Sequence, residues 1–244
     1  MRKAFRIVAG VFGVLGIVFS VPFAVISFFD DAQEIHELHN LAFVPLYGLL
    51  LGVALLLAAW RPEENVSAFL VAVASGVAGA IAGLVSGDFV SGFWFSAPIT
   101  IAILWWLHPS RSSLLRPDGA HWPTAALAVV ALVPAIASFL TQSELQRTGV
   151  AGDEHWELHH YSGMAALALA LPLCAAAACL RATGRSSGAS LVGLSAVVVA
   201  VASLALSDHV GAFDPLWAWL ALAWGLALVG LARVSTRSME PVAR

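Results

Sequence analysis

The chain has 244 residues, of which 60% are hydrophobic and only 11% charged, and its formal net charge is −3. A soluble domain carries about 25% charged residues, so this composition excludes a soluble globular protein. Apolar runs of about 20 residues, the length that crosses a bilayer core, recur along the whole chain. The sequence therefore predicts an all-α polytopic membrane protein, and the lack of alternating apolar and polar segments excludes a membrane barrel.

Eight apolar runs are predicted to be transmembrane helices. The first follows the basic start MRKAFR, as a signal peptide would. It is longer than the usual apolar region of about 7–15 residues and lacks a small-x-small cleavage site, so we predict a retained span. In chain order the predicted spans are Ile7–Phe28, His39–Trp60, Ser67–Gly87, Phe89–His108, Trp122–Thr141, His159–Leu180, Ser187–Leu206 and Val210–Arg233.

The basic residues predict how the spans are oriented. With the N-terminus inside, all 12 lysines and arginines except Arg147 fall at the inner ends of spans. The positive-inside rule then places both termini in the cytoplasm. Most acidic residues lie at the opposite ends, where they should raise the local cation concentration. We expect a multi-pass cell-membrane protein whose acidic side faces away from the cytoplasm.

The two halves of the chain match each other at an offset of 120 residues. The matched polar pairs are Glu34 and Glu154, Glu37 and Glu157, His39 and His159, Arg61 and Arg181, and Asp88 and Asp208. Each half holds four predicted spans, so both have the same orientation, as parallel repeats do. We predict two four-helix bundles, residues 1–118 and 119–244, with the boundary in the cytoplasmic stretch Leu107–His121.

The matched clusters DAQEIHELHN (31–40) and AGDEHWELHH (151–160) precede the second and sixth spans. The third and seventh spans end on the same side of the membrane, at the paired aspartates. On a helix, histidines three or four residues apart share a face. The predicted metal ligands are therefore His36, His39 and Asp88 in one half and His155, His159 and Asp208 in the other. Further candidates are Glu34, Glu37, Glu154, Glu157 and His209.

Imidazoles combined with carboxylates are ligands for zinc, copper and iron. Two facing imidazoles could instead hold haem, for which His39, His159 and His160 are the candidates. The same groups could relay protons. Structural explanations also exist, because acids favour helix N-termini and aspartates cap helices. The HELH sequence at 36–39 is not the HExxH of zinc proteases.

The layout resembles that of the haem A synthases. The shared features are two parallel four-helix halves, cytoplasmic termini, and histidines with glutamates at the starts of the second and sixth spans. That family's Glu-x-x-His occurs only at Glu157–His160, because Asn40 stands at the matching place in the first half. The family's histidines in the fourth and eighth spans and its outer-loop cysteines have no counterpart here. The resemblance implies haem as a cofactor to test.

Three functions are consistent with the sequence. The first is a membrane protein that binds a transition metal or haem at its extracytoplasmic face, with redox or metal-assisted chemistry as a consequence. The second is a proton- or cation-coupled transporter, although such sites usually lie near the bilayer midplane. The third is a non-catalytic subunit or sensor that recruits a membrane partner. Whether the protein is an enzyme stays open, and no motif predicts a nucleic-acid partner.

Overall fold

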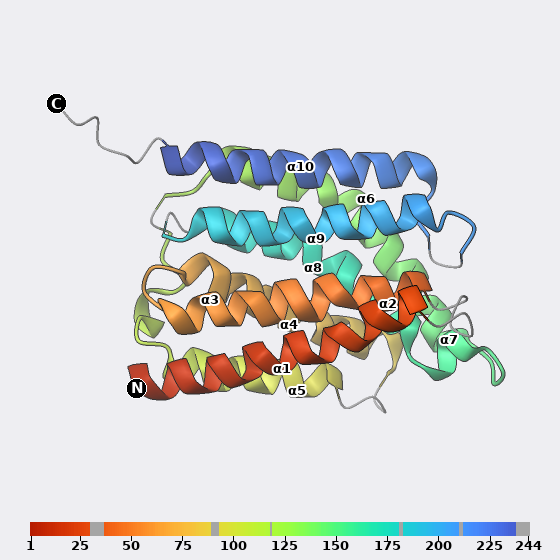
Figure 1. Cartoon of the computed structure of the whole chain (residues 1–244), viewed down its shortest axis with the longest axis horizontal. Coiled ribbons are helices and arrows are strands. Elements are labelled where there is room, and N and C mark those ends of the chain that lie inside the picture. The colour runs from red at the N-terminus through yellow and green to blue at the C-terminus, as the bar shows by residue number, and fades with distance from the viewer. Residues whose placement is uncertain (30–36, 89–92, 118, 181–182, 210–211, 238–244) are drawn as a thin grey trace.

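The computed structural model describes residues 1–29, 37–88, 93–117, 119–180, 183–209 and 212–237. Within these ranges the protein is helical and has no β-strand, as the composition predicts. The long helices lie roughly parallel along one axis of the molecule (Figure 1). Glu34 and His36 lie outside the described residues, so the part they play in the predicted cluster stays a prediction.

The first half begins with α1 (Arg2–Phe29), which contains Pro22. The second membrane segment is one continuous helical rod made of α2 (Glu37–Phe43), the π-helix η2 (Val44–Val53) and α3 (Ala54–Trp60). It is followed by α4 (Val66–Ser86) and α5 (Phe93–Leu107). The π-helix was not predicted from the sequence, and such segments are rare and often occur at functional sites.

The second half starts after the short 3₁₀ helix η3 (Arg111–Ser113). Its helices are α6 (Trp122–Thr148), α7 (Glu154–Glu157), α8 (His160–Leu180), α9 (Arg185–Ala205) and α10 (Pro215–Arg237). The sixth predicted span, His159–Leu180, corresponds to α8, and the helical turn α7 before it is separated from α8 by a break at Leu158 and His159. This interruption determines which histidines can meet.

Within the described residues, seven helices are long and apolar enough to cross a membrane. They correspond to seven of the eight predicted spans and support a multi-pass membrane protein in a lipid bilayer. The remaining prediction, Phe89–His108, coincides with α5, whose 15 residues extend about 22 Å at 1.5 Å per residue. That length is shorter than a bilayer core of roughly 30 Å, so the fourth predicted span, Phe89–His108, stays a prediction.

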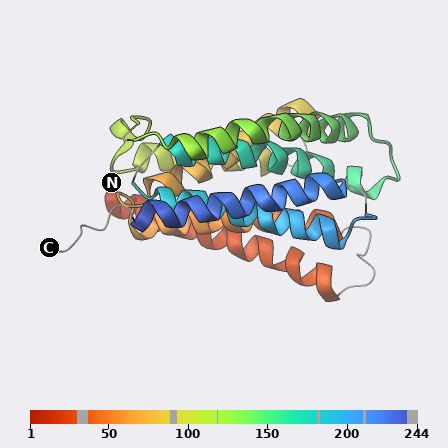
Figure 2. The same ribbon diagram turned by 90° about the horizontal axis from the view of Figure 1, so that it is seen from above.

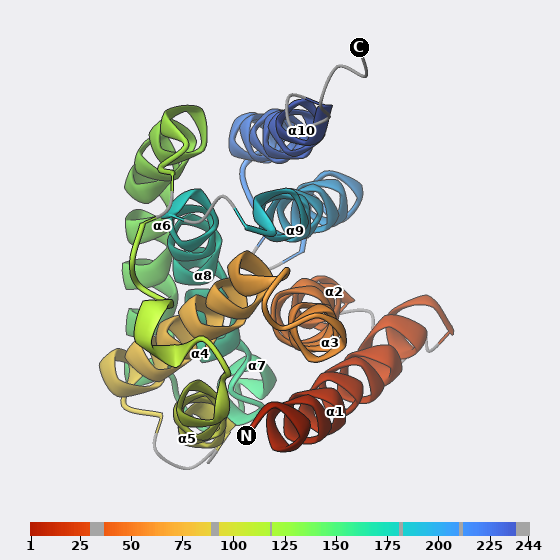
Figure 3. The same ribbon diagram turned by 90° about the vertical axis from the view of Figure 1, so that its left-hand side faces the viewer.

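The long helices divide into an inner group and a peripheral group, which consists of α1, α5, α6 and α10 (Figure 3). The inner segments are the rod of α2, η2 and α3, together with α4, α8 and α9. Their apolar windows are 61–67% buried, whereas those of α1, α6 and α10 are 17–22% buried. The Cys174 thiol of α8 donates to the Val71 carbonyl of α4 at 3.3 Å, across the boundary between the halves. The core is therefore shared between the halves, and the outer helices expose apolar faces.

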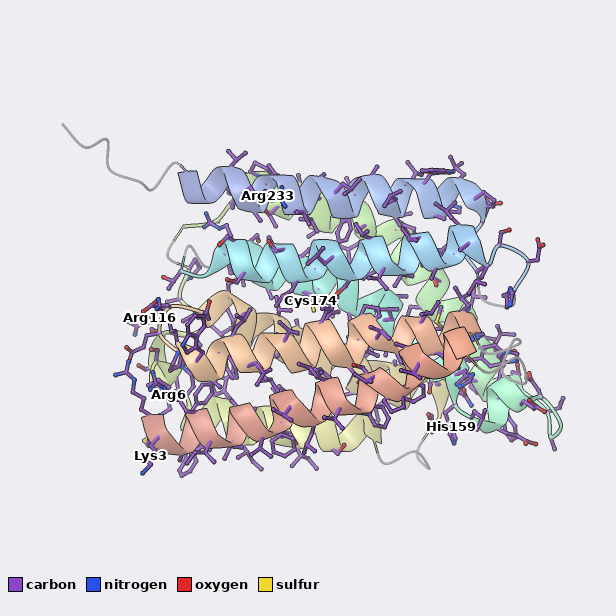
Figure 4. All side chains as sticks on the ribbon, viewed as in Figure 1. Lys3, Arg6, Arg116, His159, Cys174 and Arg233 are labelled. Atoms are coloured by element: carbon purple, nitrogen blue, oxygen red, sulfur yellow. The ribbon has the colours of Figure 1, made fainter. Side chains whose placement is uncertain are left out.

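The two ends of the molecule differ in their side chains (Figure 4). Lys3, Arg6 and Arg116 lie at the end where α1 begins, and His159 lies at the opposite end. The end of α10 lies on the same side as the start of α1. This polarity agrees with the predicted separation of basic and histidine-rich ends.

Candidate metal centre

Three buried histidines meet at the end of the molecule opposite the basic residues. His39 on α2 is fully buried, and His155 on α7 and His160 at the start of α8 are also buried. One ring nitrogen from each lies within 4.8 Å of the others. His39 comes from the first half of the chain and the other two from the second half. The three rings, here called the histidine triad, form a single cluster between the halves.

The local sequence positions His155 through the cap of α7. Asp153 precedes this short helix, and its Oδ1 accepts hydrogen bonds from the backbone N–H groups of His155 and Trp156, at 3.0 and 3.4 Å. An N-cap aspartate commonly accepts hydrogen bonds of this kind. The same Oδ1 lies 3.5 Å from Nδ1 of His155, and Oδ2 accepts from the Tyr161 hydroxyl at 3.2 Å. A carboxylate behind a ligand histidine fixes ring orientation and raises ligand basicity.

A backbone turn at His159 sends consecutive histidines in different directions. His159 has a φ of +59°, the only positive value at a non-glycine residue in the described chain. Left-handed residues of this kind are uncommon and concentrate at functional sites. The turn ends α7 and starts α8, so His160 reaches the triad while His159 points elsewhere. A continuous helix would instead have paired His155 with His159, which is what the sequence predicts.

His159 contacts a buried carboxylate from the other half of the chain. Its Nδ1 lies 3.1 Å from Oδ1 of Asp88, whose side chain is fully buried, whereas the His159 side chain is 31% exposed. Oδ2 of Asp88 accepts a hydrogen bond from the Ser162 hydroxyl at 2.7 Å. Asp88 follows α4, so this contact joins the C-terminal end of α4 to the N-terminal end of α8. His159 is adjacent to His160 of the triad in sequence, but its contact with Asp88 is a separate interaction.

Aromatic side chains surround the triad. The ring of Phe43 lies 5.6 Å from that of His160, and Tyr161 lies 5.8 Å from His155. Phe43 also fills the space beside Gly163, where an added Cβ would approach its ring carbon to 2.2 Å. A pair of hydrogen bonds between Gln146 and Trp156, 3.0 and 2.7 Å long, attaches α7 to the end of α6. These contacts hold the imidazoles in an apolar, ordered setting.

The spacing of the three rings fits coordination of one ion. With metal–nitrogen bonds of about 2.0–2.1 Å, tetrahedral imidazoles have ring centroids roughly 5 Å apart. The observed centroid distances are 4.6 Å for His39–His155, 5.2 Å for His39–His160 and 5.9 Å for His155–His160. The bonded nitrogens would lie about 3.3 Å apart, so binding would draw the outermost pair about 1.5 Å closer. The rings of His39 and His160 are nearly parallel, at an interplanar angle of 16°, so coordination of one ion would also require one of these rings to rotate.

The remaining predicted site residues lie outside the triad. Asp208 is exposed beyond α9, and His209 beside it is half-buried. Glu154 and Glu157 are exposed on α7, and Oε1 of Glu157 accepts from the Gly152 N–H at 2.9 Å. Glu37 begins α2, but its side chain is outside the described residues. Among the described residues, the triad is the group of three potential ligands that the fold brings together.

Sequence reasoning did not include Asp153, Tyr161 or Ser162 in the site. Asp153 carries a detectable signal, because it stands where an N-cap aspartate precedes the helical sequence EHWE. Ser162 has no comparable signal, because its role depends on Asp88, 74 residues away. Comparison of the chain with models of protein families, with curated proteins and with solved structures finds no match. The functional argument therefore depends on the site itself.

Proposed function

We propose that this protein is an integral membrane protein that binds one transition-metal ion through His39, His155 and His160. The observation that carries the proposal is the convergence of these three buried imidazoles within 4.8 Å. A bound cation would be a common partner for the three imidazoles. The positive-inside rule places this site on the extracytoplasmic side.

The ligand set favours zinc, copper or iron. Nitrogen ligands suit all three metals, whereas sites for softer ions use thiolates. The two cysteines lie within α8, and Cys174 donates to a backbone carbonyl of α4. Three protein ligands leave a fourth position for water or substrate, which is the arrangement of catalytic zinc sites. A metal-assisted or redox reaction is therefore consistent with the site.

A bare ion fits the surroundings better than haem does. A haem needs a flat slot beside the histidine that ligates it, and here the three rings pack against one another and against Phe43 and Tyr161. The Asp153 carboxylate beside His155 is also the partner that zinc-bound histidines commonly have. We propose further that the chain is a duplication with units 1–118 and 119–244, and that the shared site lies between them.

Elemental analysis of the purified protein tests this proposal. The protein would be purified in detergent without a histidine tag, dialysed against zinc, copper or iron, and measured for bound metal and for its absorption spectrum. We expect one ion per chain, lost in His39→Ala, His155→Ala and His160→Ala but retained in His209→Ala, a control histidine outside the triad. Protein that retains no ion, or equal metal in all variants, would refute the site. A haem absorption band would instead identify haem as the bound cofactor.

A further inference from the structure

A cavity of about 590 Å³ lies between α1, the rod of η2 and α3, and α5. Ligand pockets are commonly about 300–1,000 Å³, so the volume suits a small molecule. Its lining on α1 extends from Phe12 to Phe23, a length of about 16 Å at the helical rise. The cavity is therefore elongated along the helices. It is distinct from the triad, because none of the three histidines lines it.

The backbones of α1 and η2 are in close contact beside this space. An added Cβ at Gly16 would lie 2.8 Å from the Tyr47 carbonyl oxygen, and one at Gly52 would lie 3.0 Å from the Ile17 backbone nitrogen. Beyond this crossing α1 continues past Pro22 and slants away from the other helices toward the histidine end (Figure 2). The divergence leaves room between α1 and α5, which the side chains only partly fill.

The cavity opens onto the apolar outer surface of the helices. Val18 and Phe19 of α1 line it and are 59% and 44% exposed. In a membrane-spanning helix, exposed side chains of this kind face lipid rather than water. Molecules can therefore enter from the bilayer, and an occupant must itself dissolve in hydrocarbon.

The lining selects against charge. None of the described lining side chains is charged, and three of them carry hydroxyl groups: Tyr47, Ser96 and Thr100. A phospholipid headgroup inside this space would be an unpaired buried charge, which is strongly unfavourable. A neutral head that forms hydrogen bonds is compatible with the hydroxyls. The length of the cavity suits an alkyl or isoprenoid chain.

We infer that this cavity binds a neutral membrane-soluble molecule with an alkyl or isoprenoid chain and a small hydrogen-bonding head. Tyr47 lines the cavity on its buried side, and its ring lies 5.6 Å from that of Phe43, which in turn lies 5.6 Å from His160. Aromatic contacts thus connect the cavity to the triad. The binding itself does not depend on the proposed metal function, but this connection makes the occupant a candidate substrate for it.

Photocrosslinking in nanodiscs of dioleoylphosphatidylcholine tests the inference. The probe is hexadecanol with a diazirine in its chain, and phosphatidylcholine with the same group reports general lipid contact. We expect saturable labelling of α1 and α5 by the alcohol, which unlabelled hexadecanol competes away. Competition by a decyl-substituted benzoquinone would identify a quinone head as the better fit. Labelling by the alcohol that does not saturate and matches the phospholipid pattern would overturn the inference.

Two tryptophan substitutions on one helix provide matched variants. Thr100→Trp fills the cavity and should reduce saturable labelling about tenfold, whereas Ile99→Trp should change it less than about twofold. Ile99 is 61% exposed and does not line the cavity. If Thr100→Trp does not fold, Leu51→Phe on η2 fills the same space. Equal labelling in the filled and control variants would overturn the inference. His160→Ala, which should lose metal, should still be labelled, so the two proposals can fail separately.

Discussion

The two halves of the chain carry matching residues in unequal surroundings. His39 is fully buried in the triad, whereas its counterpart His159 is partly exposed in a left-handed turn. Asp88 is buried and contacts His159 and Ser162, whereas its counterpart Asp208 is exposed. Matching positions therefore do not have matching roles. Among the described residues, the histidines gather in one asymmetric cluster between the halves, whereas a symmetric repeat would make two equivalent clusters.

The physical origin of this asymmetry is local. In the first half, helix α2 runs without interruption into η2, so His39 points between the halves. In the second half, the chain breaks at His159 before α8 begins. Because of this break, the residue that joins the triad is His160, one residue after His159, the counterpart of His39. Asn40 stands at the position that matches His160, so the first half offers no equivalent third ring.

The largest expected effect is a difference in metal affinity between variants of the counterparts His39 and His159. His39→Asn removes a proposed ligand and should weaken metal affinity by at least about 100-fold, more than losing an outer partner does. His159→Asn should weaken it less than about tenfold, because asparagine tolerates the left-handed turn. Competitive titration with a chelator measures both affinities. Equal losses would mean that the halves contribute equivalently, against the shared-site proposal.

The next expected effect is the loss of stability in acid that results from His108, at the end of the molecule where the basic residues lie. His108 lies between the rings of Phe5 and Phe69, at centroid distances of 4.7 and 4.8 Å. Burial lowers its pKa to about 4, because the charged imidazole would lose its hydration. Its counterpart at the 120-residue offset is Leu228, which is equally buried. His108 thus occupies a position that the other half fills with an apolar side chain.

Replacing His108 by leucine should remove this acid sensitivity. The unfolded chain binds a proton near pH 6.5 and the folded chain only near pH 4, so stability is lost as pH falls between these values. This lowering of the His108 pKa corresponds to about 3 kcal/mol in the free energy of unfolding. Lowering the pH from 7 to 4 should therefore destabilise the wild type by about 3 kcal/mol more than it destabilises His108→Leu. Unfolding in detergent at the two pH values measures this difference. An equal loss in both proteins would show that His108 is not held neutral.

The smallest expected effect compares the paired aspartates. Asp88→Asn weakens hydrogen bonds to a buried charged group and should lower the free energy of unfolding by about 1.5–3 kcal/mol. Asp208→Asn changes an exposed side chain and should stay within about 0.5 kcal/mol of the wild type. Thermal unfolding in one detergent measures the difference between the two variants. If Asp208→Asn is the more destabilising, the exposed position must have a role that the structure does not explain.

Much of the fold follows from composition and periodicity. Long apolar runs predict helices, since backbone groups in lipid must be satisfied internally, and seven spans agree with the prediction. The sequence cannot predict η2, because no residue in VPLYGLLLGV requires a π-helix. Nor does it predict which helices are inner, because all the spans are similarly apolar. That distinction depends on packing between segments far apart in the chain.

The site could be predicted only in part, because local spacing was applied to a helix that is interrupted. His39, His155 and His160 were all candidates, and the structure brings them together. The grouping by halves differs from the structure, because Asp88 contacts His159 from the other half. One positive φ angle decides this outcome. Such an angle at a histidine has no sequence signature, unlike the glycines that usually adopt it.

The contact between Phe43 and Gly163 bears on how this chain can change over time. Their numbers differ by 120, so under the proposed duplication they descend from a single position, and they touch each other. Two phenylalanines could not occupy this space, and two glycines would leave a void. Substitutions at either place are therefore tied to the other, because Gly163→Phe would overpack this contact and Phe43→Gly would leave a cavity.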